Sequence, residues 1–152
     1  MTDEIRYRDA NIRDALDIVS FQVAMARETE SIDLNRYIVS RGVEAVFEDR
    51  THGRYFVAES GSDIIASLMI TFEWSDWRNG VVWWIQSVYV RPEFRRRGVY
   101  AGLYEHVRGI ASTNETVKGI RLYVDERNTA AQEVYKRLGM DGQHYRVFEW
   151  MK

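Results

Sequence analysis

The sequence predicts an α+β domain with the element order β-α-α-β-β-β-α-β-α-β. Two observations lead to this fold class. Three β-rich segments follow one another over residues 54–90 with short turns, which favours an antiparallel meander. Helical and strand patterns then alternate from residue 98 onward, which is typical of a βαβ unit. At 152 residues the chain has the size of one domain, so we expect residues 1–152 to form a single domain.

The first part of the chain combines a short strand with two helices. Residues 5–8 form the strand candidate. Apolar side chains then recur at the helical period over about residues 12–28, at Ile12, Leu16, Val19, Val23 and Ala26. Asp33 is a suitable N-cap for a second helix that extends toward Phe47, and Gly42 is expected to kink or divide it.

The middle and last parts contain the remaining strands. Residues 54–59 and 64–74 are joined by a Ser-Gly-Ser-Asp turn and predict a hairpin, and residues 81–90 form a third strand. Gly98 opens a helix whose inner face is expected to carry Tyr100, Leu103, Tyr104, Val107, Ile110 and Ala111. A strand over 120–124 follows. Next comes a helix with a capping box from Thr129 to Gln132 and a Gly139 end, and then a last strand over 145–151.

Composition excludes several classes of protein. The 45% apolar and 29% charged residues with a single proline exclude a disordered or collagen-like chain. The chain has no cysteine, which removes disulfides, thiolate metal sites and cysteine nucleophiles. The three histidines, at positions 52, 106 and 144, lack the spacing of metal ligands, so no metal is expected. No apolar run is long enough for a membrane span, and the first residues do not resemble a secretory signal, so we expect a cytoplasmic protein.

The segment from Val88 to Ala101 carries the clearest chemical signal. It is a strand, then a loop that contains Arg95, Arg96 and Arg97, then Gly98 at the start of a helix. Free amides and the dipole at a helix N-terminus bind anions, and a glycine lets the backbone approach a pyrophosphate closely. The alternative interpretation is a solvated basic turn. The segment is neither a P-loop nor a dinucleotide-binding fingerprint, because the further glycines and the Lys-Ser/Thr pair are missing.

A second segment, from Arg121 to Met140, makes the pattern specific. Together the two segments resemble the GNAT superfamily of acetyl-CoA-dependent N-acetyltransferases. The phosphate loop of that family reads Arg/Gln-x-x-Gly-x-Gly/Ala, which Arg95 and Gly98 match, whereas Tyr100 stands where a small residue is usual. The later family pattern, Asn-x-x-Ala-x-x-x-Tyr-x-x-x-Gly-Phe, is met at Asn128, Ala131, Tyr135 and Gly139, with Met140 in place of the aromatic residue.

The resemblance implies a mixed sheet in which central antiparallel strands adjoin a splayed parallel pair, with helices on both faces. It also implies an acetyl-CoA site. Backbone groups around Val88, Tyr89 and Val90 would pair with the pantetheine arm, and the loop would hold the pyrophosphate. The cofactor-binding residues expected from the resemblance are Val88, Tyr89, Val90, Arg95, Arg96, Arg97, Gly98, Val99, Tyr100, Ala101, Asn128, Ala131 and Tyr135.

The implied reaction is direct transfer of the acetyl group to a primary amine, with Tyr135 as the acid that protonates the leaving thiolate. Many family members place a carboxylate near position 86, where this chain has Gln86. Gln86 can hold a water but cannot take a proton, so Glu73 and Asp76 are the substitute bases. Their alternative interpretation is a solvated turn or an ion pair with Arg78.

The acceptor is expected to be a small cationic amine, although a peptide or protein amine stays open. Acidic and aromatic side chains suit a cation, and the candidates are Glu28, Glu30, Trp74, Trp77 and Trp84. Capping and sheet packing are their alternative interpretations. Two other functions compete. A CoA-binding sensor without catalysis fits Gln86 and Tyr100, and a basic nucleic-acid module fits the arginines but not the net charge of −2. A short tail that leaves a sheet edge free favours a homodimer.

Overall fold

The structure is a computed structural model that describes residues 4–152. Within these residues, five strands form one sheet in the order β1-β2-β3-β4-β5. The first four strands pair antiparallel, and β5 pairs parallel with β4. The strands are β1 (Ile5–Asp9), β2 (Arg54–Ser60), β3 (Asp63–Ser75), β4 (Gly80–Val90) and β5 (Val117–Leu122). This mixed sheet confirms the expected meander followed by a βαβ unit.

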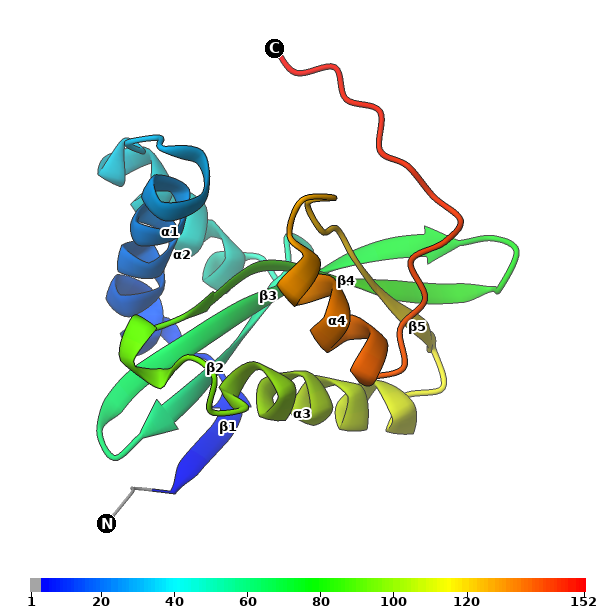
Figure 1. Ribbon diagram of the computed structural model, residues 1–152, viewed down its shortest axis with the longest axis horizontal. Coiled ribbons are helices and arrows are strands. Elements are labelled where there is room, and N and C mark those ends of the chain that lie inside the picture. Colours follow the sequence, from blue (N-terminus) through cyan, green and yellow to red (C-terminus); the bar gives the residue numbers. More distant parts are fainter. Residues whose placement is uncertain (1–3) are drawn as a thin grey trace.

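Helices cover both faces of the sheet (Figure 1). One face carries α1 (Ala15–Glu30) and α2 (Arg36–Glu48), and the other carries α3 (Val99–Thr113) and α4 (Thr129–Arg137). Short 3₁₀ turns, Ile12–Asp14 and Pro92–Phe94, precede α1 and α3. None of the helices in residues 4–152 is long and apolar enough to cross a membrane. The expected fold class is confirmed.

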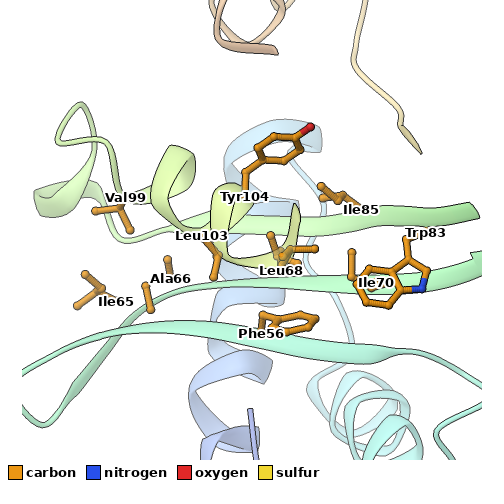
Figure 2. Packing of buried hydrophobic residues seen from close by; sticks show 12 residues of the cluster. Phe56, Ile65, Ala66, Leu68, Ile70, Trp83, Ile85, Val99, Leu103 and Tyr104 are labelled. Atoms are coloured by element: carbon orange, nitrogen blue, oxygen red, sulfur yellow. The ribbon is translucent and has the colours of Figure 1, made fainter. Parts of the chain in front are cut away.

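The larger core lies between the sheet and α3. Leu103 and Val107 of α3 are fully buried against Phe56, Leu68 and Ile70 of β2 and β3. Figure 2 shows Leu103 of the helix facing the strands that carry Leu68, Ile70 and Phe56. The face predicted for this helix from its periodicity is the buried one. Trp83 is 4% exposed and belongs to this core, whereas the other tryptophans do not.

The α1 helix buries a different face from the predicted one. Ile18, Val19 and Phe21 are buried against the sheet, but Leu16 is 75% exposed. The prediction failed because apolar residues occur at two phases along α1, so more than one helical face satisfies the same period. Packing against Tyr89, whose ring lies 5.0 Å from that of Phe21, favours the phase that is observed.

Several predicted helix ends move by one or two residues. Asn35 caps α2 in place of Asp33, because its side chain accepts the amides of Tyr37 and Ile38. Gly42 lies inside an uninterrupted α2 and neither kinks nor divides it. Asn128, not Thr129, caps α4. Each of these positions offers a neighbouring residue with the same capping chemistry, and only the backbone path decides between them.

The strand predicted over Tyr145 to Met151 is not formed. Residues 141–152 run as an extended tail without regular structure, and its aromatic side chains are exposed. The tail leaves α4 and passes outward from the sheet (Figure 1). A strand needs a paired neighbour and a buried face as well as β-prone residues. This segment has neither within residues 4–152.

Candidate functional site

The site begins where β4 and β5 separate. Their pairing ends at Ile85 and Leu122, so residues 86–90 of β4 have β3 on one side and no strand on the other. The register of β4 against β3 shifts between Ser67 and Met69, opposite Ser87, whose φ is +54°. A bulge of this kind increases the local twist and re-aims the strand. The splay expected for the parallel pair is therefore present.

Backbone groups on the open side of β4 are free to bind an extended ligand. The Arg91 amide donates to the Ile65 carbonyl of β3 over 2.9 Å, which places that amide on the closed side. Because backbone groups alternate along a strand, those of Val88 and Val90 point to the open side. The Val90 carbonyl is already an acceptor there for Arg95 Nε at 2.9 Å, which leaves the groups of Val88 available.

The loop before α3 forms a cradle of amides. Among the described residues, no hydrogen-bond acceptor is recorded for the amides of residues 96–101. Gly98 is the N-cap with φ +75°, and Arg96 two residues earlier also has a positive φ, of +61°. Successive free amides at a helix N-terminus are the geometry that phosphate groups bind. The residues present therefore fit the pyrophosphate of a CoA molecule.

The three arginines of the loop do not act alike. Arg95 turns back toward α1, where its Nη2 donates to Glu28 Oε2 at 2.8 Å and its guanidinium lies over the Tyr89 ring. Arg96 and Arg97 are exposed beside the amide cradle. Glu28 also accepts the Tyr89 hydroxyl at 3.4 Å. Glu28 and Arg95 thus connect the end of α1 to the loop, so two residues expected at different subsites form one ion pair.

Helix α4 presents Tyr135 toward α3. The Tyr135 ring meets that of Tyr100 edge-to-face with centroids 5.9 Å apart. Burial raises the pKa of the Tyr135 hydroxyl, so the phenol is neutral at physiological pH. Asn128 is 3.1 Å from the amide of Ala131, which its side-chain oxygen accepts as the N-cap of α4. A neutral phenol is chemically suited to donate a proton.

The candidate bases lie in different places. Glu73 Oε1 accepts Arg121 Nη1 at 2.6 Å, and its Oε2 accepts Trp84 Nε1 at 3.2 Å. The ion pair is therefore with Arg121, not with Arg78 as the alternative interpretation had it. Asp76 lies in the β3–β4 turn and accepts the Trp77 amide at 2.9 Å.

Gln86 and Glu73 lie on the face of the sheet that carries α1 and α2, but outside the part of that face which these helices cover. Gln86 Nε2 donates to Thr71 Oγ1 over 2.6 Å. The Trp84 ring lies 4.6 Å from that of Tyr123 on the same face. Trp74 and Trp77 are 64% and 92% exposed near the tip of the hairpin. Trp84 is thus in contact with Glu73, whereas Trp77 is exposed at the hairpin tip.

Glu30 is the last residue of α1 and is exposed. Its charge adds weakly to that of Asp125 in raising the pKa of the Arg127 guanidinium, in the loop between β5 and α4. Of the two acidic residues of α1 named from the sequence, Glu28 is therefore joined to the loop before α3 by Arg95, and Glu30 stays exposed.

Three residues of this region had no counterpart in the sequence analysis. Ser87 is the bulged residue, and Arg121 and Tyr123 complete the polar face beside β4. Serine within a β-rich run is a weak turn signal that could have indicated the bulge. Alternation along residues 120–124 could have placed Arg121 and Tyr123 on one face. His106, which the sequence analysis treats only as a residue without metal-ligand spacing, stacks on Tyr7 and lies edge-to-face with Phe56.

Comparison with known proteins agrees with this geometry. The model of the acetyltransferase (GNAT) family matches residues 22–140. The splayed sheet, the amide cradle and this match together define the class, and the chain belongs to the GNAT family of acetyltransferases. It is an acyltransferase enzyme. The family uses acetyl-CoA as the acetyl donor. No curated protein matches the chain.

Several solved structures are similar to this chain. A possible acetyltransferase from Clostridium difficile 630 is 37% identical, with 97% of each chain covered and a TM-score of 0.90. A predicted acetyltransferase with acetyl-CoA from Clostridium acetobutylicum is 21% identical, with 96% of each chain covered and a TM-score of 0.75. A ribosomal-protein-alanine N-acetyltransferase from Brucella melitensis is 11% identical and covers 98% of this chain and 100% of its own, with a TM-score of 0.79. The last two share the fold.

Proposed function

We propose that this protein transfers an acetyl group from acetyl-CoA directly to a primary amine in a ternary complex. The observation that carries the proposal is the run of free amides at residues 96–101 beside the open edge of β4. The acceptor is a small cationic amine, because Glu73, Trp84 and Tyr123 lie together on one sheet face and the end of α1 adds the acidic Glu28 and Glu30. No metal takes part.

Bound acetyl-CoA supplies an activated thioester carbonyl. The amides of residues 96–101 hold the pyrophosphate, and Arg96 and Arg97 add positive charge beside it. The Val88 amide on the open side of β4 stabilises negative charge on the carbonyl oxygen. Tyr135 donates its phenolic proton to the sulfur as the C–S bond breaks, and the amine nitrogen forms the new C–N bond.

The amine must lose a proton before it can attack. Glu73 is the carboxylate on the same sheet face as Gln86, and each of its oxygens has one protein donor and a second lone pair free. A water held by Gln86 and Glu73 can therefore carry the proton from the amine to the carboxylate. Asp76, at the tip of the hairpin, is the second candidate for this role.

The experiment that tests the function measures thiol release from acetyl-CoA with a panel of amines. The panel contains spermidine, lysine, an aminoglycoside and a short peptide with a free N-terminus. Turnover of spermidine above the others supports a small cationic acceptor, and preference for the peptide replaces it with a protein amine. Binding of acetyl-CoA without any thiol release in the panel leaves a CoA-binding sensor, a reading that Gln86 favours because it cannot act as a base.

Tyr135→Phe tests the proton donor. The substitution keeps the ring and its contact with Tyr100 but removes the hydroxyl. We expect kcat to fall about 10²–10⁴-fold, the usual contribution of general acid catalysis. The acetyl-CoA affinity and the melting temperature should stay within error of the wild type. Full turnover of the variant under single-turnover conditions would assign Tyr135 to the wall of the site.

The assembly and the location belong to the same proposal. We propose a single acetyltransferase domain over residues 1–152 that works in the cytoplasm, without nucleic acid or membrane, as a homodimer. The outer edge of β5 has no neighbouring strand within residues 4–152, and Tyr145, Phe148 and Trp150 of the tail are exposed. A second copy can cover both. Light scattering of the intact chain and of a chain ending at residue 143 measures whether the dimer forms and whether the tail is needed.

A further inference from the structure

Tyr100 is the residue of the phosphate loop region that the sequence pattern does not account for. It is the second residue of α3, and its ring packs edge-to-face on Tyr135 of α4, with centroids 5.9 Å apart and an interplanar angle of 73°. Its hydroxyl is buried and completes no hydrogen bond of good geometry among the described residues, although the Tyr135 phenol is near enough to act on its pKa. A bulky aromatic side chain therefore stands directly against the proposed proton donor.

A buried hydroxyl without a partner is unfavourable, because it has lost its water and gained nothing in exchange. Such groups are rare in native proteins and call for an explanation such as a catalytic role. The titratable groups that act on the Tyr100 hydroxyl are the phenols of Tyr135 and Tyr104. The missing acceptor would exist if Tyr135 became negatively charged, since a phenolate oxygen is a strong hydrogen-bond acceptor.

We propose that Tyr100 is a positioning residue for Tyr135, whose hydroxyl hydrogen-bonds to the Tyr135 oxygen as that oxygen gives up its proton. The inference rests on the proposed function, in which Tyr135 protonates the leaving thiolate. The proton passes from the Tyr135 oxygen to the sulfur as the C–S bond breaks. The phenolate that is left accepts the Tyr100 hydrogen bond and later takes a proton from water.

The electrostatics of the pair agree with this role. Burial raises the pKa of Tyr100, and the neighbouring Tyr135 raises it further, so Tyr100 keeps its proton and acts as a donor. Burial also raises the pKa of Tyr135, but the Tyr100 hydroxyl lowers it. A donor with a lower pKa is a stronger acid toward the thiolate.

Few other ionisable groups face the pair. From α3, Tyr104 lies next to Tyr100 with ring centroids 6.4 Å apart, and the charges of Glu105 and Arg108 act on Tyr104. From α4, the ionisable neighbours in sequence are exposed, and Lys136 pairs with Glu133 at 3.3 Å. Apart from burial, which has the largest effect, the pKa of Tyr135 should therefore depend chiefly on Tyr100.

The test is a double-mutant cycle with Tyr100→Phe, Tyr135→Phe and the pair, and with Tyr104→Phe as the matched control. Tyr104 lies on the same helix and is buried, but its contact is with Tyr100. Thiol release is measured with acetyl-CoA and spermidine, and with acetyl-CoA in water alone, because hydrolysis needs the same protonation of sulfur. Melting temperature and acetyl-CoA affinity are measured for every variant.

We expect Tyr100→Phe to lower kcat about 3- to 10-fold through the weaker acidity of Tyr135, with the KM for acetyl-CoA unchanged. The alkaline limb of the pH profile should move to higher pH, because loss of the hydrogen bond raises the pKa of Tyr135. In the Tyr135→Phe background, Tyr100→Phe should cause no further loss. Tyr104→Phe should leave kcat and the profile unchanged.

An ultraviolet difference titration gives a second readout that needs no turnover. The difference between wild type and Tyr135→Phe reports ionisation of Tyr135, and the same difference in the Tyr100→Phe background should appear at higher pH. Equal losses of kcat in both backgrounds, or an unchanged Tyr135 titration, would overturn the role of Tyr100. Absence of thiol release in the wild type would instead count against the proposed function, and the titration would still decide whether Tyr100 lowers the pKa of Tyr135.

Discussion

Gly98→Val is the single change best suited to abolish binding at the proposed phosphate site while the domain stays folded. Gly98 has φ +75°, and a Cβ built there meets no other atom within 4 Å. The substitution therefore causes no clash in the free protein, and its cost comes from the left-handed backbone alone. That cost is about 1–2 kcal/mol. For a domain of this size it lowers the melting temperature by about 2–8 °C.

Binding of acetyl-CoA supplies the signal that the variant should lose. A ligand at 100 times its Kd stabilises the folded state by about 2.7 kcal/mol, which corresponds to about 5–10 °C here. A β-branched side chain at position 98 would stand within the cradle formed by the amides of residues 96–101. If affinity falls 100-fold, the same ligand concentration stabilises the variant by about 0.4 kcal/mol, a shift of about 1 °C.

The assay is thermal unfolding with and without acetyl-CoA. Gly98→Asn is the first control, because asparagine tolerates a positive φ with less strain. Gly109→Val is the second, since Gly109 lies on α3 with open space around it and no positive φ. The Gly109 variant should keep the full ligand shift. A full shift in Gly98→Val would refute the assignment of the phosphate site to this loop.

Three further changes test other parts of the structure. Glu73→Gln should lower turnover about 10²-fold at neutral pH, with recovery at high pH, while Asp76→Asn keeps the wild-type pH profile. If both variants keep the wild-type pH profile, the base lies elsewhere. Asp14→Asn should lower the free energy of unfolding by about 1–3 kcal/mol at pH 7. Burial opposes the ionisation of Asp14, but hydrogen bonds from Arg8 and the Asn11 amide leave its pKa lowered. The ionised carboxylate therefore contributes to the free energy of unfolding above pH about 4, and this contribution disappears as the pH falls. The urea midpoints of the wild type and the variant should converge in acid. Gly102→Ala should cost about 1–3 kcal/mol, because its Cβ would overlap a tyrosine ring of β1, whereas Gly109→Ala should cost nothing.

The sequence predicted the fold class because periodicity and turn chemistry are local properties. The hairpin at residues 60–63, the buried face of α3 and the Gly139 end of α4 all follow from residues close together in the chain. Local patterns were insufficient where two helix faces or two capping residues fitted the sequence equally well. The buried face of α1 and the cap of α2 were decided by what packs against them.

The last predicted strand failed for a related reason, because a local pattern does not specify the tertiary neighbours of a segment. Tyr145 to Met151 have the composition of a strand, but strand formation depends on an available partner edge, which no pattern within the segment encodes. The phosphate loop is the opposite case. The amides proposed to bind phosphate follow directly from a glycine and a helix start, so a short motif was enough to predict them.

The sequence by itself determined the α+β class, the free amides around Gly98 and the place of Tyr135 on α4. Only the tertiary structure decided how side chains from separate elements pair. It joined Glu28 of α1 to Arg95, Glu73 of β3 to Arg121 of β5, and Tyr100 of α3 to Tyr135 of α4. The physical reason is that these contacts join residues 35 to 67 positions apart in sequence. Their geometry is fixed by the register of the sheet and the packing of helices on it, which no local pattern specifies.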